Sequence, residues 1–116
     1  MMIKLYHNPR CSKSRDALKA LETLGLDIEV IEYLKNPLTI SDYQSLKKQL
    51  AINSYREMMR QKESIYQENH LAEADEETLL QALVEHPILL ERPIASTGHQ
   101  AAIGRPLENI LNLLKK

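Results

Sequence analysis

The sequence predicts a single α/β domain, and three features of its 116 residues support this prediction. A strand–helix–strand pattern opens the chain, helical spacing without a strand pattern fills its middle, and a strand–strand–helix pattern closes it. A chain of this length holds one hydrophobic core rather than two. We therefore expect one domain over 1–116, with a helical insertion at about 38–86.

The opening pattern is a βαβ unit. Residues 2–6 alternate in polarity and predict a short strand, while 12–24 carry apolar side chains at helical spacing. Gly25 is suited to end that helix, and 28–33 form the second strand candidate. The two strands should be parallel, because a helix connects them by a right-handed crossover.

The middle of the chain is expected to be all-helical. Asn36-Pro37 breaks the strand pattern, and Thr39 or Ser41 is placed to cap the next helix. We expect helices to about Leu50, at 55–60 and at 75–85, with a polar stretch to about 69 before the last.

The closing pattern begins after His86-Pro87, which ends the insertion. A hairpin through Thr97-Gly98 and a final helix, which Pro106 suits at its first turn, are the main expectations. The expected segments are a short buried strand at 88–90, extended chain at 92–95, a strand at 100–103 and a helix with apolar spacing over 107–114.

The composition is ordinary and excludes several classes of protein. Apolar residues make up 43% and charged residues 27%, and the net charge of -1 gives no general attraction to nucleic acid or membrane. No apolar run approaches the ~20 residues of a membrane span, and a signal peptide is not evident. The single cysteine allows no internal disulfide, which favours the cytoplasm. No metal site is expected, because the four histidines are scattered: His7, His70, His86 and His99.

Cys11 is the candidate nucleophile. It stands between a strand and the predicted start of a helix, where unsatisfied backbone N–H groups and the helix dipole favour a thiolate over a thiol. Arg10 and Arg15 add positive charge, and the same N–H groups can hold an oxyanion. The alternative is a small buried apolar side chain, as many lone cysteines are.

His7 and Arg15 flank this cysteine in a His-x3-Cys-x3-Arg pattern. His7 can orient or help ionise the thiol, and Arg15, one helical turn on, can support a bound anion. Ser14 occupies the second position of a C-x-x-C motif, so the site has one thiol and any disulfide step needs a thiol from another molecule. The alternatives are a loop histidine, a solvated arginine and a serine bonded to the backbone of the first helical turn.

Three further arginines are candidates for binding an anion. Guanidinium groups match tetrahedral oxyanions in a bidentate manner. Arg92 and Arg105 each precede a proline, which favours extended backbone in a loop, and an Arg92–Pro93 bond can also be cis. Arg60 is the third, and spacing alone leaves open whether these three are surface residues or meet at Cys11.

Four segments together resemble the glutaredoxin-dependent arsenate reductase family. They are Tyr-His-Asn-Pro-Arg-Cys-Ser-Lys-Ser-Arg at 6–15, Glu-Tyr-Leu-Lys-Asn-Pro at 32–37, His-Pro-Ile-Leu-Leu-Glu-Arg-Pro-Ile at 86–94 and Gly-Arg-Pro at 104–106. The resemblance covers essentially the whole chain and is strongest to the short, arsenate reductase-like branch, which lacks the C-terminal extension of the longer arsenical resistance enzymes.

The resemblance implies a thioredoxin-like fold with a helical insertion, and an oxidoreductase in which Cys11 attacks arsenate while His7 and Ser14 tune the thiol. It implies no bound cofactor, since glutathione and glutaredoxin act as external reductants. We expect the protein to act as a monomer, although nothing in the sequence determines its oligomeric state. The family's three anion-binding arginines fall on Arg60, Arg92 and Arg105, with Arg56 as a competitor for the first.

Two other functions stay open from the sequence. One is a thiol oxidoreductase or glutathionylation-linked redox protein that keeps the reactive Cys11 and has no physiological arsenate activity. The other is a regulator that binds RNA polymerase, as relatives with this fold do. Those relatives carry a C-x-x-C switch, and the serine at position 14 disfavours this function.

Overall fold

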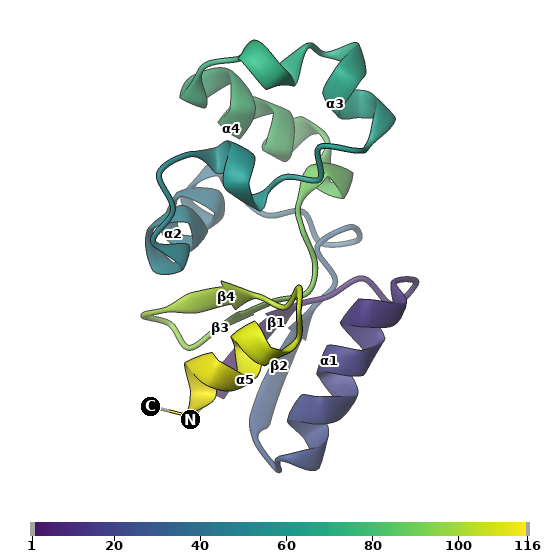
Figure 1. Ribbon diagram of the computed structural model, residues 1–116, viewed down its shortest axis with the longest axis vertical. Coiled ribbons are helices and arrows are strands. Elements are labelled where there is room, and N and C mark those ends of the chain that lie inside the picture. The colour runs from purple at the N-terminus through teal and green to yellow at the C-terminus, as the bar shows by residue number, and fades with distance from the viewer. Residues whose placement is uncertain (1, 116) are drawn as a thin grey trace.

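A four-stranded mixed sheet forms the lower half of the molecule in Figure 1. The computed structural model describes residues 2–115, so the two ends of the expected 1–116 domain lie outside the described residues. The strand order is β2-β1-β3-β4. The strands are β1 (Met2–Tyr6), β2 (Asp27–Ile31), β3 (Ile94–Ser96) and β4 (Ala101–Ile103). β1 pairs with β2 in parallel and with β3 antiparallel, which places the closing hairpin beside the first strand.

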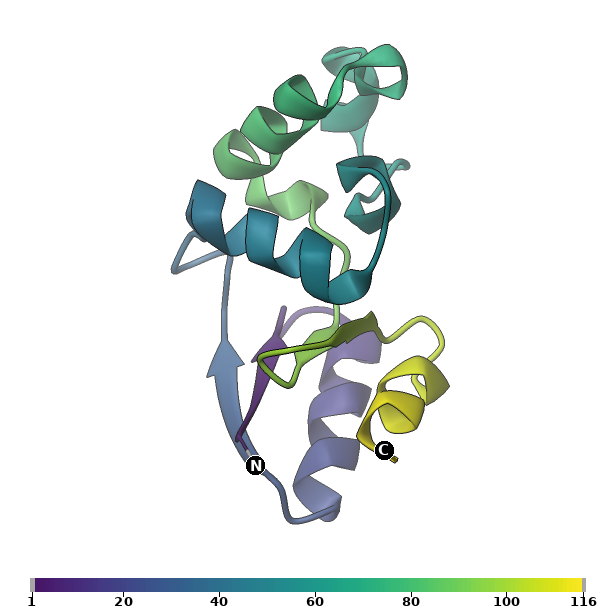
Figure 2. The ribbon, with the colours of Figure 1, turned by 90° about the vertical axis from the view of Figure 1, so that its left-hand side faces the viewer.

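Helices α1 (Ser12–Thr23) and α5 (Glu108–Leu114) cover the same face of the sheet (Figure 2). Their apolar side chains, among them Ala17, Leu21 and Ile110, pack against Ile3 and Leu5 of β1, and all five are fully buried. α1 ends where the sequence predicts, because Gly25 adopts φ 71°, a conformation that a side chain disfavours.

The helical insertion lies between β2 and β3 in the chain and above the sheet in Figure 1. Its α2 begins with a capping box in which Thr39 and Asp42 satisfy each other's backbone N–H groups, as the predicted cap at Thr39 requires. The Tyr43 hydroxyl donates to the Leu83 carbonyl at 3.1 Å and joins α2 to α4. The elements of the insertion are α2 (Ile40–Leu50), α3 (Ser64–Glu68), α4 (Glu76–Glu85) and the 3-10 turns η1 (Tyr55–Met58), η2 (Leu71–Glu73) and η3 (Pro87–Leu89).

Two segments differ from the sequence prediction. The polar stretch before residue 69 contains α3, whose single buried side chain, Tyr66, is too little to produce an apolar repeat. The strand predicted at 88–90 is instead the turn η3, which Pro87 begins, and only Leu90 forms a β-bridge, with Met59.

The two Arg–Pro bonds near the sheet are both cis. The possibility of a cis Arg92–Pro93 bond is confirmed, whereas the cis Arg105–Pro106 bond was not predicted. Pro106 precedes the final helix instead of lying in its first turn, since α5 begins at Glu108.

Candidate active site

Cys11 is the N-cap residue of α1, with extended backbone at φ -96° and ψ 121°. Its N–H donates to the Asn8 carbonyl at 3.0 Å, and its own carbonyl accepts from Arg15 N–H at 3.0 Å, the first bond of the helix. The cysteine thus ends the loop that leaves β1 and begins the helix. Its sulfur therefore faces the free backbone N–H groups of the first turn.

The pKa of the Cys11 thiol is lowered from its ordinary value. Burial raises this pKa, but hydrogen bonds from the Ser14 and Lys13 backbone N–H groups and from the Arg92 side chain outweigh burial, with the charge of Arg105 adding to them. Each of these groups stabilises the charged form of the sulfur. Because the side chain is half-buried rather than enclosed, the thiolate can be reached from outside.

Arg105 and Arg92 meet at the thiol. The Arg105 Nη2 donates to Cys11 Sγ at 3.5 Å, while its Nε donates to the Arg92 carbonyl at 2.8 Å. Arg92 is only 8% exposed, and its Nη1 donates to the Ile88 carbonyl at 3.4 Å. Its Nε is buried with no hydrogen-bond partner among the described residues. A buried, unpaired guanidinium nitrogen is costly unless an anion satisfies it.

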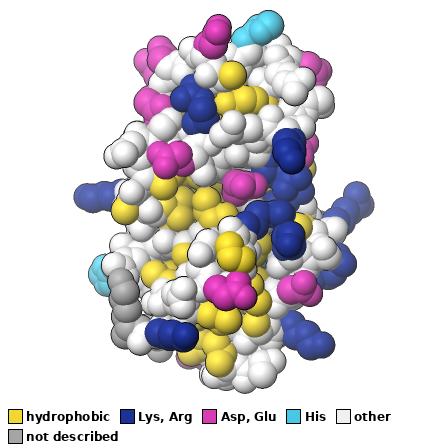
Figure 3. Space-filling model, viewed as in Figure 1, with side chains coloured by type: hydrophobic (Ala, Val, Ile, Leu, Met, Phe, Trp, Pro, Cys, Tyr) yellow, Lys and Arg dark blue, Asp and Glu magenta, His cyan; other side chains and the backbone are white. Residues whose placement is uncertain are grey.

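Arg60 lies at the edge of the same region. Its Nε pairs with Glu63 at 3.0 Å, and its backbone N–H donates to the Leu89 carbonyl at 2.7 Å, next to the Met59–Leu90 bridge. Arg60 and Arg105 line one surface pocket of about 390 Å³. Figure 3 shows Lys and Arg side chains gathered at mid-height on this face, between the insertion and the sheet.

Arg56, the competing candidate, lies elsewhere. Its Nη2 donates to the carbonyl oxygens of Leu71 at 3.1 Å and Ala74 at 2.7 Å, which holds η2 inside the helical insertion. The structure therefore places Arg92 and Arg105 at Cys11 and Arg60 beside Arg105 in the pocket. Arg56 supports the insertion instead, and the role of Arg60 in anion binding stays a prediction.

His7 and Ser14 contact each other beneath the cysteine loop. The His7 Nδ1 lies 2.7 Å from the Ser14 Oγ, which also accepts from the Asn8 backbone N–H at 3.1 Å. Both side chains are buried, and burial, with a smaller effect from Arg15, lowers the pKa of His7 despite the opposing charge of Glu32. These contacts fix the loop that carries Cys11, and the Ser14 backbone N–H bonds the thiol itself.

Arg15 supports this loop from outside. Its Nη1 donates to the Pro9 carbonyl at 3.0 Å, and the side chain is exposed. Its described hydrogen bond is therefore with the loop backbone, and its expected role in anion binding stays a prediction.

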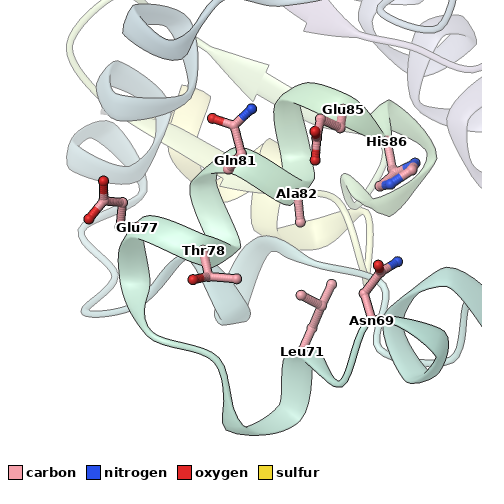
Figure 4. Close-up of a pocket in the computed structure, with 8 residues that line it drawn as sticks. All are labelled: Asn69, Leu71, Glu77, Thr78, Gln81, Ala82, Glu85 and His86. Carbon is pink, nitrogen blue, oxygen red and sulfur yellow. The ribbon is translucent and has the colours of Figure 1, made fainter.

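A second pocket of about 370 Å³ lies wholly in the insertion (Figure 4). Its side chains come from α4 and the segments at either end of it, with acidic groups such as Glu77 and Glu85 and no cysteine or arginine. Nothing connects it to the chemistry at Cys11. Over residues 2–115, no three metal-ligating side chains are grouped to hold an ion, and no helix is long and apolar enough to cross a membrane.

Three residues of this region were not predicted from the sequence. Tyr33 is fully buried, and the charges of Arg92 and Arg60 act on its hydroxyl against the effect of burial, which raises its pKa. Lys62 and Glu91 line the pocket beside Arg105. The available signal for Lys62 and Glu91 was their proximity in sequence to the candidates Arg60 and Arg92.

The chain is similar to a known protein family and to several known proteins. The model of the ArsC family matches residues 6–113. An arsenate reductase of Neisseria meningitidis (serogroup A / serotype 4A, strain DSM 15465 / Z2491) is 48% identical over 110 residues, covering 93% of this chain and 94% of the relative. The Uncharacterized protein YfgD of Escherichia coli (strain K12) is 47% identical over 114 residues, covering 97% and 96%.

Solved structures agree with the sequence comparisons. The arsenate reductase from Vibrio cholerae superposes with a TM-score of 0.94 at 42% identity, covering 98% of each chain. The α/β, thioredoxin-like fold expected from the sequence is thereby confirmed.

Proposed function

We propose that this chain, which belongs to the ArsC family, reduces arsenate to arsenite with Cys11 as the nucleophile. The observation that carries the proposal is the position of the Cys11 sulfur. It lies at the start of α1 and 3.5 Å from Arg105 Nη2, beside the buried Arg92. Nucleophile and anion-binding groups occupy one place.

Arsenate would bind between the arginines and the first backbone N–H groups of α1. Arg92 supports this arrangement, because its Nε is buried without a partner among the described residues and an arsenate oxygen would supply one. The helix start adds N–H donors and the positive end of the dipole. Arg60 is the third candidate, and Nε is the only atom of its guanidinium with a hydrogen bond to a described residue.

In the first chemical step the Cys11 thiolate attacks arsenic. An As–S bond forms, and one arsenate oxygen takes up protons and leaves as water, so arsenic is still As(V). The arginines stabilise the negative charge on the remaining oxygens, as electrostatic catalysis requires. A lowered thiol pKa keeps the nucleophile in its reactive form near neutral pH.

The reducing equivalents come from two external thiols, because Cys11 is the only cysteine of the chain. Glutathione attacks the arsenic adduct and glutaredoxin supplies the remaining equivalent. Arsenic gains two electrons and leaves as arsenite, while the two thiols become a disulfide and Cys11 is regenerated. The sum is arsenate plus two thiols giving arsenite, one disulfide and water.

Phosphate should enter the same site, because its shape and charge match those of arsenate. A thiol cannot reduce it, so the selectivity for arsenate comes from the redox step more than from binding. We expect phosphate to be a weak competitive inhibitor. A rate of arsenate reduction that did not change in a large excess of phosphate would count against this site.

A coupled assay tests the reaction and its reductant. NADPH oxidation is followed with arsenate, glutathione, glutathione reductase and glutaredoxin, comparing wild type with Cys11→Ser, and then with thioredoxin and its reductase in place of the glutaredoxin system. Turnover should need arsenate, glutaredoxin and Cys11. A folded protein whose Cys11 alkylates rapidly but turns over with neither system would be a thiol oxidoreductase of another kind.

A further inference from the structure

We propose that the pocket lined by Arg60, Lys62, Glu91 and Arg105 is the binding site for glutathione. This binding site rests on the proposed function for its role in arsenate reduction. The binding itself can be measured without arsenate, through thiol–disulfide exchange at Cys11.

The need for such a site follows from the cysteine count. With one cysteine in the chain, a second thiol must be brought to the Cys11 sulfur or to an adduct on it. The pocket is in place for this task, since Arg105 borders it and also donates to Cys11 Sγ at 3.5 Å. Its volume of about 390 Å³ lies within the ordinary range for small-ligand sites.

The charges of the pocket match those of glutathione. Glutathione carries two carboxylates and one ammonium group at neutral pH. The pocket presents three cationic side chains, Arg60, Lys62 and Arg105, and one acidic side chain, Glu91. The arginines can hold carboxylates with paired hydrogen bonds, and Glu91 can accept from the ammonium.

The backbone around the pocket is held in place before any ligand arrives. Met59 and Leu90 form an antiparallel bridge. Beside it, Arg60 N–H donates to the Leu89 carbonyl at 2.7 Å and Glu91 N–H donates to the Met58 carbonyl at 2.9 Å. These bonds hold the backbone of Arg60 and Glu91 side by side, which lowers the entropy cost of ordering the site when a ligand binds.

The pocket is adjacent to the oxyanion site and differs from it. Arg92, whose side chain helps to lower the pKa of the thiol, does not line the pocket, whereas Arg105 borders both places and Arg60 is a candidate for both. An arsenic adduct on Cys11 and a glutathione in the pocket would therefore be neighbours with Arg105 between them. Lys62 and Glu91 belong to the pocket alone, which makes them the residues to test.

The test measures exchange of Cys11 with glutathione disulfide and with the neutral hydroxyethyl disulfide. The Cys11 thiolate attacks one disulfide sulfur, a new S–S bond forms, and the other half leaves as a thiolate. The ratio of the two rate constants is compared with the ratio for an unstructured cysteine peptide of the same local sequence. The variant is Lys62→Glu. The matched control is Lys19→Glu, which makes the same charge change at an exposed position of α1, about two turns after Cys11.

The proposal predicts a ratio above the peptide value in wild type. Lys62→Glu should lower it by about threefold to tenfold, and added salt should lower it as well, because the contact is exposed and screened. Lys19→Glu should keep the wild-type ratio. A wild-type ratio equal to the peptide value, or equal effects of the two variants, would overturn the proposal.

The same experiment separates this proposal from the proposed function. A glutathione preference that depends on Lys62, in a protein that does not reduce arsenate, would support the pocket and contradict the reductase. Arsenate turnover with glutaredoxin but without any preference for glutathione disulfide would overturn the pocket, and would point to a protein thiol acting directly.

Discussion

Arg105 Nη2 lies 3.5 Å from the Sγ of Cys11, although 94 positions of the chain separate the two residues. The contact depends on the antiparallel pairing of β3 with β1, which returns the end of the chain to the loop before α1. The Arg92 carbonyl holds the Nε of Arg105 at 2.8 Å and so fixes the direction of the guanidinium. The thiol environment is therefore a property of the whole sheet.

The reactivity of Cys11 should depend on pH with a midpoint below the ordinary ~8.5 of a cysteine. The folded protein favours the thiolate, so alkylation by iodoacetamide should rise with pH through the lowered pKa and level off above it. Arg105→Ala should move the midpoint up, because it removes a positive charge beside the sulfur. Alkylation rates from acid to mildly alkaline pH measure both midpoints.

Stability should depend on the same group in a defined direction. The folded pKa of Cys11 is lowered, so its ionisation adds stability above the unfolded pKa, and that contribution is lost as pH falls through the folded pKa. The Cys11→Ser variant should lack this contribution. An alkylation midpoint at or above that of the unfolded chain would contradict the thiolate environment described here.

Ser14→Ala should destabilise the loop that carries Cys11. It leaves the His7 Nδ1 and the Asn8 N–H without their shared partner in a buried place, which costs about 1–3 kcal/mol. Urea unfolding measures this loss, with the exposed Ser12→Ala in the same turn as the control. Equal effects of the two substitutions would mean that the buried Ser14 hydroxyl does not support the loop.

Arg56 and Arg60 should separate stability from activity. Arg56→Ala loses two hydrogen bonds to backbone carbonyls inside the insertion and should cost about 1–3 kcal/mol of unfolding free energy with little change in the KM for arsenate. Arg60→Ala breaks only a partly exposed pair with Glu63, so its stability loss should stay below about 1 kcal/mol while the KM rises.

Each arginine variant is the control for the other. Urea unfolding and steady-state kinetics on the two proteins give all four values. A larger KM effect from Arg56→Ala than from Arg60→Ala would reverse the assignment.

Gly104 permits the close packing that positions Arg105. A Cβ at this position would lie 2.6 Å from Ile110 Cδ1 and 2.9 Å from Pro93 Cγ, so Gly104→Ala should destabilise the fold by about 1–3 kcal/mol. Ile110→Val removes the Cδ1 atom. The double variant should therefore lose less stability in urea unfolding than the sum of the two single losses, and simple additivity would contradict this steric account.

Local patterns explain what the sequence predicted well. The helix stop at Gly25 and the cap at Thr39 depend on conformation and hydrogen bonds within a few residues, and both are confirmed. Helix α3 was missed because one buried tyrosine, Tyr66, produces no periodic signal. The strand expected at 88–90 failed because Pro87 begins a turn there.

The candidate site combines local and distant features. The place of Cys11 at the start of α1 followed from the sequence, since it depends on the adjoining strand and helix. The choice between Arg56 and Arg60 did not, because both lie in the same short segment and differ only in the partners that the folded insertion offers. The contacts of Arg92 and Arg105 with the thiol likewise required the assembled sheet.

Arsenic speciation tests most directly whether this chain reduces arsenate with Cys11 as the nucleophile. The purified protein is incubated with arsenate, glutathione and glutaredoxin, and arsenite is separated from arsenate by chromatography and quantified, with Cys11→Ser as the matched protein. We expect arsenite well in excess of the enzyme concentration for wild type and only the uncatalysed background for Cys11→Ser. Equal arsenite from the two proteins would contradict this expectation.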